Sequence, residues 1–213
     1  RSSDLAIFGA SHLVQRISKD PKKTLDEMLF HGRKAEALNP ENPLALMSIA
    51  AAYFFRGDHP TALDYAQRAV KFNPSYAFSF FWLSLAQLHS GDFQQGEESI
   101  LKGIELSPAD PNMNHFNATH YFALLGQGRY DEALVAIDKA LRQHKAGLML
   151  GFRAAVLGHL ERGPEAKTAL DRYLALRPNL KTRDDYRRIF VPNSALADPI
   201  IEGLVKAGWE TDE

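Results

Sequence analysis

Short motifs recur along this chain with a period of about 34 residues, and that period limits the architecture more than any other feature. Asn39-Pro40 recurs one period later as Asn73-Pro74, and Ser107-Pro108 follows after another period. Gly57-Asp58 recurs at Gly91-Asp92 with the same spacing. Because repeats of about 20 to 50 residues are typical of solenoids and related arrays, we expect one structural unit to be stacked several times.

Each period predicts two helices with a turn between them. In the first period, residues 43–56 are rich in Ala and Leu, Gly57 provides a left-handed turn residue, and Pro60 lies near the start of the second helix. The third copy of the turn, at Gly128, comes later than the period requires, which indicates a three-residue insertion. No segment shows the alternation that is typical of a half-buried strand. The predicted fold class is therefore all-α.

Small side chains recur where paired helices would approach each other. Ala50, Ala62 and Ala69 are matched one period later by Ser84, Gly96 and Gly103. A helix-turn-helix repeat with this period, small residues at fixed positions, a turn glycine and a closing proline resembles the tetratricopeptide repeat (TPR) family. The resemblance implies a right-handed TPR superhelix, which is an α-solenoid of helix-turn-helix repeats.

The same resemblance divides the chain into parts. Residues 1–42 are expected to form an N-terminal helical pair from an incomplete repeat, with Asp4 to Ser18 as its first helix. Residues 179–213 are expected to form a capping segment, in which Asp198-Pro199 begins an amphipathic helix. The four repeats between them are predicted over residues 43–74, 75–108, 109–145 and 146–178.

The composition argues against several classes of function. Lys and Arg together number 25 and Asp and Glu 26, so a formal net charge of −1 gives no overall field to attract nucleic acid. No apolar run is long enough to insert into a membrane. The absence of Cys is compatible with a cytoplasmic protein. We therefore predict a cytoplasmic location, no nucleic-acid partner and no membrane insertion.

Catalytic and metal-binding motifs are absent from the sequence. It contains no glycine-rich phosphate loop, no dinucleotide-binding fingerprint and no H-E-x-x-H zinc motif. His115 and His120, the closest His pair, are too widely spaced along the chain to share one face of a helix. Adjacent carboxylates such as Glu97-Glu98 diverge on a helix and suit solvation better than acid–base chemistry. We expect no catalytic residue, no cofactor and no metal, and hence a protein that is not an enzyme.

In TPR proteins the first helix of each repeat lines a concave groove, so the lining residues follow from equal offsets to the turn glycine. Counting back from Gly57, Gly91, Gly128 and Gly163 gives a largely apolar lining. The candidate partner-binding residues are Leu44, Met47, Phe54, Phe78, Phe81, Leu85, Leu88, His115, Phe122 and Arg153. Family members that bind chaperone C-termini hold a carboxylate with Lys, Arg and Asn, whereas Met47, Phe81 and Ala118 occupy those positions here.

Such a groove allows two interpretations. In the first interpretation, the groove receives an amphipathic helix or an extended apolar segment from a protein or peptide partner, and Arg153 or His115 adds polar specificity. Alternatively, the N-terminal helix, the Ile200–Val205 tail or a second copy of the chain fills it. Under the first interpretation, Phe81→Asp abolishes binding and leaves the helices intact, whereas collapse of the fold would assign Phe81 to the core.

The C-terminal tail resembles a narrower group of proteins. Residues 195–208, after a last repeat that ends at Arg177-Pro178, are similar to the end of bacterial class III adenylate or guanylate cyclases and some winged-helix regulators. The resemblance implies that the chain is the C-terminal regulatory region of a larger bacterial signalling protein, and a start at Arg1 without Met favours a piece of something longer. The alternatives are a cyclase whose catalytic domain lies upstream, and a free-standing TPR scaffold.

Overall fold

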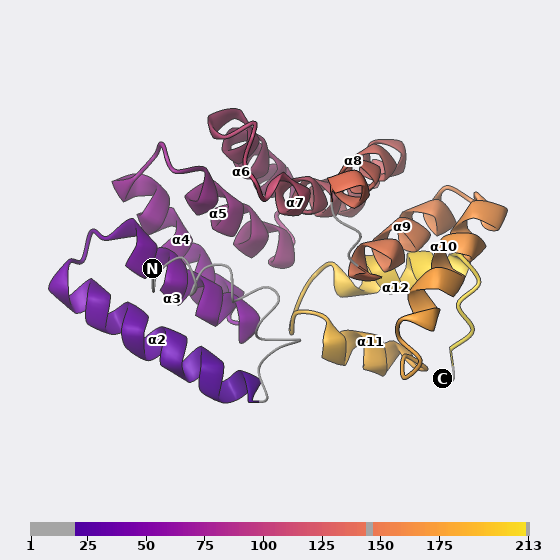
Figure 1. Cartoon of the computed structure of the whole chain (residues 1–213), viewed down its shortest axis with the longest axis horizontal. Coiled ribbons are helices and arrows are strands. Elements are labelled where there is room, and N and C mark those ends of the chain that lie inside the picture. Colours follow the sequence, from indigo (N-terminus) through magenta and orange to yellow (C-terminus); the bar gives the residue numbers. More distant parts are fainter. Residues whose placement is uncertain (1–19, 144–146, 212–213) are drawn as a thin grey trace.

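The computed structural model describes residues 20–143 and 147–211 (Figure 1). Eleven helices and no strand lie within these two ranges, which confirms the all-α prediction. The first helix expected over Asp4 to Ser18 lies outside the described residues. The helices are α2 (Pro21–Leu38), α3 (Pro43–Phe55), α4 (His59–Phe72), α5 (Ala77–His89), α6 (Phe93–Leu106), α7 (Met113–Gly126), α8 (Tyr130–Gln143), α9 (Gly147–His159), α10 (Gly163–Ala175), α11 (Arg183–Ile189) and α12 (Ala197–Lys206).

Successive helices pack as antiparallel pairs that follow an open arc. The pairs are α3–α4, α5–α6, α7–α8 and α9–α10, and each pair also packs against the next. In Figure 1 the arc runs from α2 at one end, through α6 and α8, to α10 and α11 at the other. This arrangement confirms the predicted α-solenoid. The residue limits given above for the repeats remain a prediction.

The turn inside each of the first three pairs has one geometry, which fixes the register of the repeats. Gly57, Gly91 and Gly128 have φ values of 76°, 92° and 72°. The residue that follows each of them donates its N–H to the carbonyl five positions back, as Asp58 does to Tyr53 at 3.0 Å. Glycine suits such left-handed positions because it has no Cβ to clash with the backbone.

The fourth pair departs from the sequence-based register. Its left-handed residue is Glu161, with a φ of 58°, and Arg162 donates its N–H to the carbonyl of Leu157 at 3.0 Å. Gly163 is already the first residue of α10. Offsets counted from Gly163 are therefore displaced by two positions in the fourth repeat.

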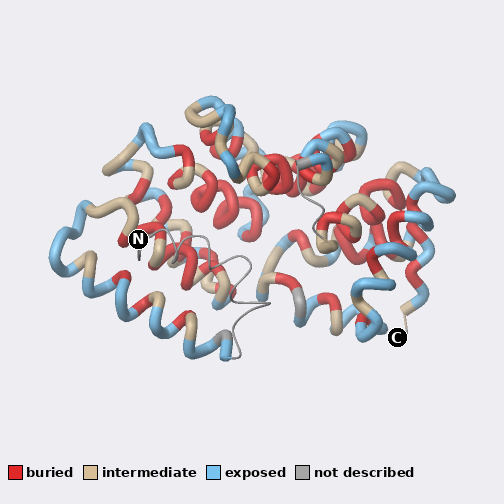
Figure 2. Tube along the Cα trace, viewed as in Figure 1, coloured by how far each residue is buried: buried red, intermediate tan, exposed pale blue. Residues whose placement is uncertain are grey.

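The small residues that recur with the period lie in the core. Ala62, Ala66 and Ala69 of α4 are at most 1% exposed. A Cβ on Gly96 would lie 2.3 Å from Cδ2 of Leu88, so the buried Leu88 side chain already fills the space that a larger residue would need. Buried residues concentrate on the faces where helices meet, and exposed ones on the outer faces (Figure 2).

The helices α11 and α12 follow the fourth pair, and we call them the cap because α12 packs on α9. A Cβ on Gly203 of α12 would lie 2.3 Å from the carbonyl oxygen of Ala155, so this helix lies directly on the backbone of α9. Gly208, with a φ of 97°, follows the end of α12, and Trp209 donates its N–H to the carbonyl of Leu204 at 3.0 Å. Because this is the turn found in the repeats, α12 is built like the first helix of one more repeat. It covers the apolar face that α9 would otherwise expose.

Within the described residues, no helix combines the length and the apolar character that crossing a bilayer requires.

Candidate partner-binding site

One row of predicted groove residues lies at the surface. Leu44, Phe78 and His115 occupy the same position relative to the turn glycine on α3, α5 and α7, and each is partly exposed. Leu148, counted from Glu161, occupies that position on α9 and is also partly exposed. We call Leu44, Phe78, His115 and Leu148 the entry row. It crosses four successive first helices near their N-terminal ends.

The other predicted groove residues of the first three repeats are deeply buried. Phe81 is 6% exposed, and its ring centroid lies 5.0 Å from that of Phe78, 5.5 Å from Trp82 and 5.3 Å from Phe116. Phe81 is thus a core residue of the N-terminal half. The full set, all at most 8% exposed, is Met47, Phe54, Phe81, Leu85, Leu88 and Phe122.

The structure places Arg153 away from the groove positions. Because the fourth turn is displaced, Arg153 occupies the position that Ile49 and Leu83 occupy in α3 and α5. Its Nε donates to Oδ1 of Asp138 on α8 at 2.8 Å. It lines a cavity of about 570 Å³ between α8, α9 and α10, together with Arg142 and other residues of these helices.

The segment Phe190–Ala195, between α11 and α12, returns to the first repeat, and we call it the clasp. Nε2 of His59 donates to the carbonyl oxygen of Pro192 at 2.9 Å, and Nδ2 of Asn193 donates to the carbonyl oxygen of Gly57 at 3.2 Å. The N–H of Ala195 donates to the carbonyl oxygen of His89 at 3.0 Å. The clasp therefore joins the C-terminal cap to the turn end of the first two repeats.

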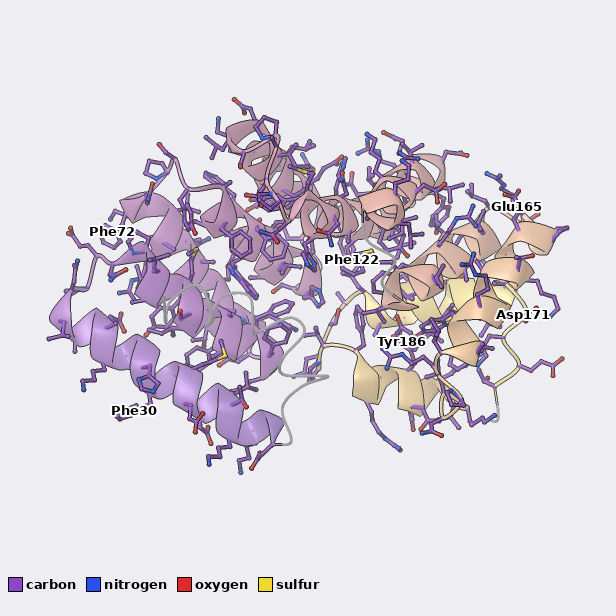
Figure 3. All side chains as sticks on the ribbon, viewed as in Figure 1. Phe30, Phe72, Phe122, Glu165, Asp171 and Tyr186 are labelled. Atoms are coloured by element: carbon purple, nitrogen blue, oxygen red, sulfur yellow. The ribbon has the colours of Figure 1, made fainter. Side chains whose placement is uncertain are left out.

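Phe190 anchors the clasp in an aromatic pocket. Its ring stacks on His89 with centroids 5.6 Å apart, and it meets the edges of Phe122 at 6.2 Å and Phe152 at 6.3 Å. Tyr186 of α11 also stacks on it at 5.6 Å, and Figure 3 shows Phe122 and Tyr186 on α7 and α11. With Phe190 only 6% exposed, the chain itself covers this part of the concave face.

The Ile200–Val205 tail, one of the occupants that the sequence suggests for the groove, lies elsewhere. It belongs to α12, which packs on α9. The clasp is the segment that covers the groove, and the sequence reasoning missed it. The signal available was the apolar run Ile189-Phe190-Val191, directly before Pro192-Asn193.

Two buried histidines face the clasp. The rings of His59 and His89 lie 5.6 Å apart, and both residues are at most 3% exposed. Burial lowers the pKa of His59, although the hydrogen bond to Pro192 and the charge of Asp58 oppose this shift. Burial, reinforced by the charge of His59, holds the pKa of His89 well below its ordinary value. Both rings are therefore neutral at neutral pH, and the bond to the Pro192 carbonyl requires the His59 proton on Nε2.

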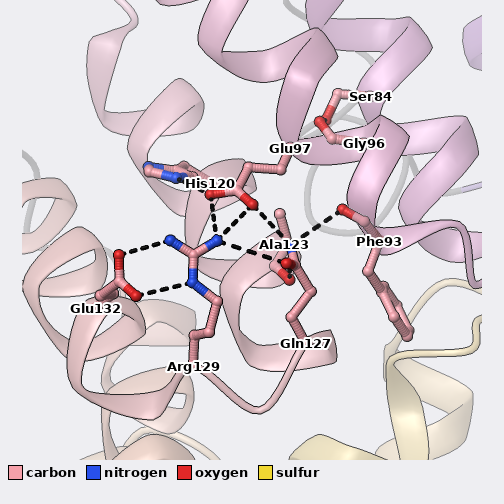
Figure 4. A network of polar contacts seen from close by, with 9 residues as sticks. All are labelled: Ser84, Phe93, Gly96, Glu97, His120, Ala123, Gln127, Arg129 and Glu132. Carbon is pink, nitrogen blue, oxygen red and sulfur yellow. Dashed lines mark hydrogen bonds and ion pairs between the residues drawn. The ribbon is translucent and has the colours of Figure 1, made fainter.

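A separate polar network ties the second repeat to the third (Figure 4). Glu97 of α6 accepts from Nε2 of Gln127 at 2.8 Å and from Nη1 of Arg129 at 2.6 Å, and it lies 3.2 Å from Nε2 of His120. Arg129 also binds Glu132 through two hydrogen bonds of 2.8 and 2.6 Å. The Glu97 side chain is only 13% exposed, so these partners replace most of its water.

The network lowers the pKa of Glu97. Burial is the strongest single influence and raises this pKa, but the hydrogen bonds from Gln127 and His120 and the charge of Arg129 together outweigh it. A carboxylate whose pKa is lower in the folded state stabilises the fold above its unfolded pKa, and this contribution is lost as the pH falls through the folded value.

We expect Glu97→Gln to lower the free energy of unfolding by about 1 to 3 kcal/mol at pH 7, because a hydrogen-bonded charge is removed from a largely buried site. Thermal melts at pH 7 and over a series of lower pH values measure the effect. The difference from the unsubstituted chain should shrink as the pH falls through the lowered pKa of Glu97. The exposed neighbour Glu98 provides the control, since Glu98→Gln should change little. Equal losses in both variants would contradict the interpretation.

No cluster of three or more His, Asp or Glu side chains suited to a metal ion occurs in residues 20–143 and 147–211.

Comparison with known proteins finds tetratricopeptide repeat proteins that match part of the chain. Residues 33–77 match the model of the tetratricopeptide repeat family. Small glutamine-rich tetratricopeptide repeat-containing protein 2 of Mycosarcoma maydis is 35% identical over 77 residues, which are 36% of this chain and 22% of that protein. The Hsc co-chaperone sgt12 of Aspergillus fumigatus is 35% identical over 72 residues, which are 34% of this chain and 21% of that protein. The chain thus spans about a fifth of the length of the curated relatives it matches.

Solved structures share the fold along most of the chain. A thermophilic TPR protein of Thermus thermophilus covers 95% of this chain and 99% of its own, with a TM-score of 0.65 and 17% identity. PilF of Pseudomonas aeruginosa covers 98% of this chain and 90% of its own, with a TM-score of 0.64 and 13% identity. YrrB, described as a TPR protein with an unusual peptide-binding site, gives a TM-score of 0.56 at 17% identity, over 82% of this chain and 86% of its own.

Proposed function

We propose that this chain is a non-catalytic protein-interaction module that binds a partner segment along the entry row of its concave face. The observation that carries the proposal is the recurrence of partly exposed side chains at one position of four successive first helices. A periodic row of this kind offers contacts at regular intervals to a helix or an extended segment. The core beneath the row holds it in place, because the next groove position inward is buried in each helix.

The chemistry of the row favours an apolar partner. Leu44, Phe78 and Leu148 are apolar, and His115 adds one polar group. Two relatives are fungal proteins, one of them named as a co-chaperone, but the positions at which family members hold a peptide carboxylate carry Met47, Phe81 and Ala118 here. All three are at most 7% exposed. We therefore propose an amphipathic helix or an extended apolar segment, rather than a C-terminal carboxylate, as the partner.

The setting of the module is proposed from the tail alone. The resemblance of residues 195–208 to cyclase tails supports a C-terminal regulatory region of a larger bacterial signalling protein in the cytoplasm. A cyclase with its catalytic domain upstream, tuned through dimerisation, and a free-standing scaffold are the alternatives. Sequencing the reading frame upstream of Arg1 tests them, because a catalytic domain with paired metal-binding Asp residues would identify the cyclase and a nearby start codon would remove it.

Phe78→Gln should weaken partner binding at least tenfold, because an aromatic side chain that becomes buried on binding is the usual source of affinity in such a contact. Apolar peptides would first be selected from a displayed library on the unsubstituted chain. Their dissociation constants would then be measured by fluorescence anisotropy for both proteins, with circular dichroism to confirm that Phe78→Gln stays helical.

A matched substitution on the outer surface controls this experiment. Val135 of α8 is 55% exposed, so Val135→Gln makes a comparable polar change away from the entry row. It should leave binding unchanged. Equal affinities for Phe78→Gln and Val135→Gln, in folded proteins, would refute the proposed site.

A further inference from the structure

The clasp is seated in the way that a bound peptide would be. Two of its contacts use main-chain groups, the carbonyl of Pro192 and the N–H of Ala195, which any extended segment presents. The groups that meet them, Nε2 of His59 and the carbonyl of His89, belong to the first and second repeats. Main-chain hydrogen bonds of this kind supply affinity without depending on the sequence of the bound segment.

The seat also selects side chains. The ring of Phe190 fills the pocket between His89, Phe122 and Phe152 described above. Pro192 lies against Gly57, where a Cβ would come within 2.9 Å of the Cβ of the proline. The pocket therefore takes an aromatic ring, and the glycine takes a proline two positions later.

The clasp lies over its seat without being enclosed by it. Pro192, Asn193 and Ala195 are exposed on their outer sides, and no helix includes them. Asn193 has a φ of 57°, a left-handed conformation that the seated segment must maintain. The Phe190 ring, the Val191 side chain packed on the N-terminal core and three hydrogen bonds hold the clasp, and a separate extended segment could make the same contacts.

We propose that the clasp is an intramolecular ligand, and that its seat, formed by Gly57, His59, His89, Phe122 and Phe152, binds an extended segment of another protein. That segment carries an aromatic residue two positions before a Pro-Asn pair, as in Phe190 to Asn193. The inference rests on the proposed function, since it adds a second partner segment to the same concave face. The seat and the entry row share no residue, so each can fail without the other.

The test is competition between the clasp and a free copy of it. The probe is a fluorescein-labelled peptide with the sequence of residues 187–197, and the protein is the full chain. Phe190→Ala weakens the internal competitor and leaves the seat intact. We expect it to bind the peptide at least tenfold more tightly than the unsubstituted chain, because a tethered ligand competes at high effective concentration.

Two controls make the experiment specific. Phe30 on α2 is 65% exposed, and Phe30→Ala should leave peptide affinity at the level of the unsubstituted chain. A peptide with Ala in place of its single aromatic residue should bind none of the proteins. If this altered peptide binds as well as the original, the aromatic pocket is not the site and the proposal fails.

A second variant keeps the proposal testable if Phe190→Ala loses its fold. Asn193→Ala removes the hydrogen bond to Gly57, also disfavours the left-handed backbone at this position, and should give a smaller increase in the same direction. The proposal is overturned if no folded clasp variant binds the peptide more tightly than the unsubstituted chain. Loss of library-selected peptides from Phe78→Gln with unchanged clasp-peptide binding would show that the two sites are independent.

Discussion

Phe81→Asp is expected to unfold the N-terminal half of the solenoid rather than only block partner binding. The ring is 6% exposed and lies among Phe78, Trp82 and Phe116, where a carboxylate would find aromatic faces in place of water. Burying an unpaired charge and losing an aromatic core residue each cost several kcal/mol. We expect a loss of about 4 kcal/mol or more in the free energy of unfolding.

The two Trp residues provide local probes for this measurement. Trp82 is 2% exposed in the N-terminal half and Trp209 is 4% exposed in the cap, so a chain with Trp209→Phe reports on the first half alone. The fluorescence of Trp82 should shift to the red in Phe81→Asp under conditions that leave Phe81→Leu folded. The conservative variant should cost less than about 1.5 kcal/mol. If Phe81→Asp melts at nearly the same temperature as the unsubstituted chain, Phe81 lies at the groove surface and not in the core.

Gly203→Val is expected to detach the C-terminal cap. A Cβ at Gly203 would lie 2.3 Å from the carbonyl oxygen of Ala155, and backbone atoms cannot move aside as a flexible side chain can. The helix α12 must therefore separate from α9 and expose Ile200, Ile201 and Leu204, all at most 3% exposed. Overpacking costs about 1 to 3 kcal/mol where the structure adapts, and we expect about 3 kcal/mol or more here.

Fluorescence of Trp209, in a chain with Trp82→Phe, measures this effect because the residue lies close after the end of α12. Denaturant titration should show the cap unfolding at a lower midpoint, with Trp82 in the reciprocal variant changing less. Gly163 provides the matched control, since a Cβ there would meet no atom within 4 Å. Gly163→Ala should stay within about 0.5 kcal/mol. Equal midpoints for Gly203→Val and Gly163→Ala would contradict the close packing of the two helices.

Features that depend on neighbouring residues could be predicted from the sequence. The left-handed glycines and the small residues between paired helices follow from local steric requirements, which recur with the period of the repeats. The fourth turn shows where this reasoning stops. Glu161 occupies the left-handed position there without being glycine, and the nearby Gly163 belongs to the next helix. A pattern read from glycine alone is therefore displaced by two positions.

The candidate site was harder to predict because exposure depends on elements far apart in the chain. Phe78 and Phe81 look equivalent in sequence, yet one is partly exposed and the other belongs to the core. The clasp joins Pro192 to Gly57 and His59 through contacts that no local pattern specifies. Periodicity predicts on which side of its helix a residue lies, but it does not show which distant segment of the chain covers that side.

The clasp has a consequence for how this chain responds to heat or denaturant. In an ordinary solenoid each repeat contacts only its neighbours, so stability is close to a sum of nearest-neighbour terms and the ends fray independently. A contact between Asn193 and Gly57 closes a loop through nearly all the repeats. The entropy of closing a loop grows only slowly with its length, so this contact costs little more than a short one. The first repeat and the C-terminal cap are thereby coupled directly, in addition to the coupling between neighbouring repeats.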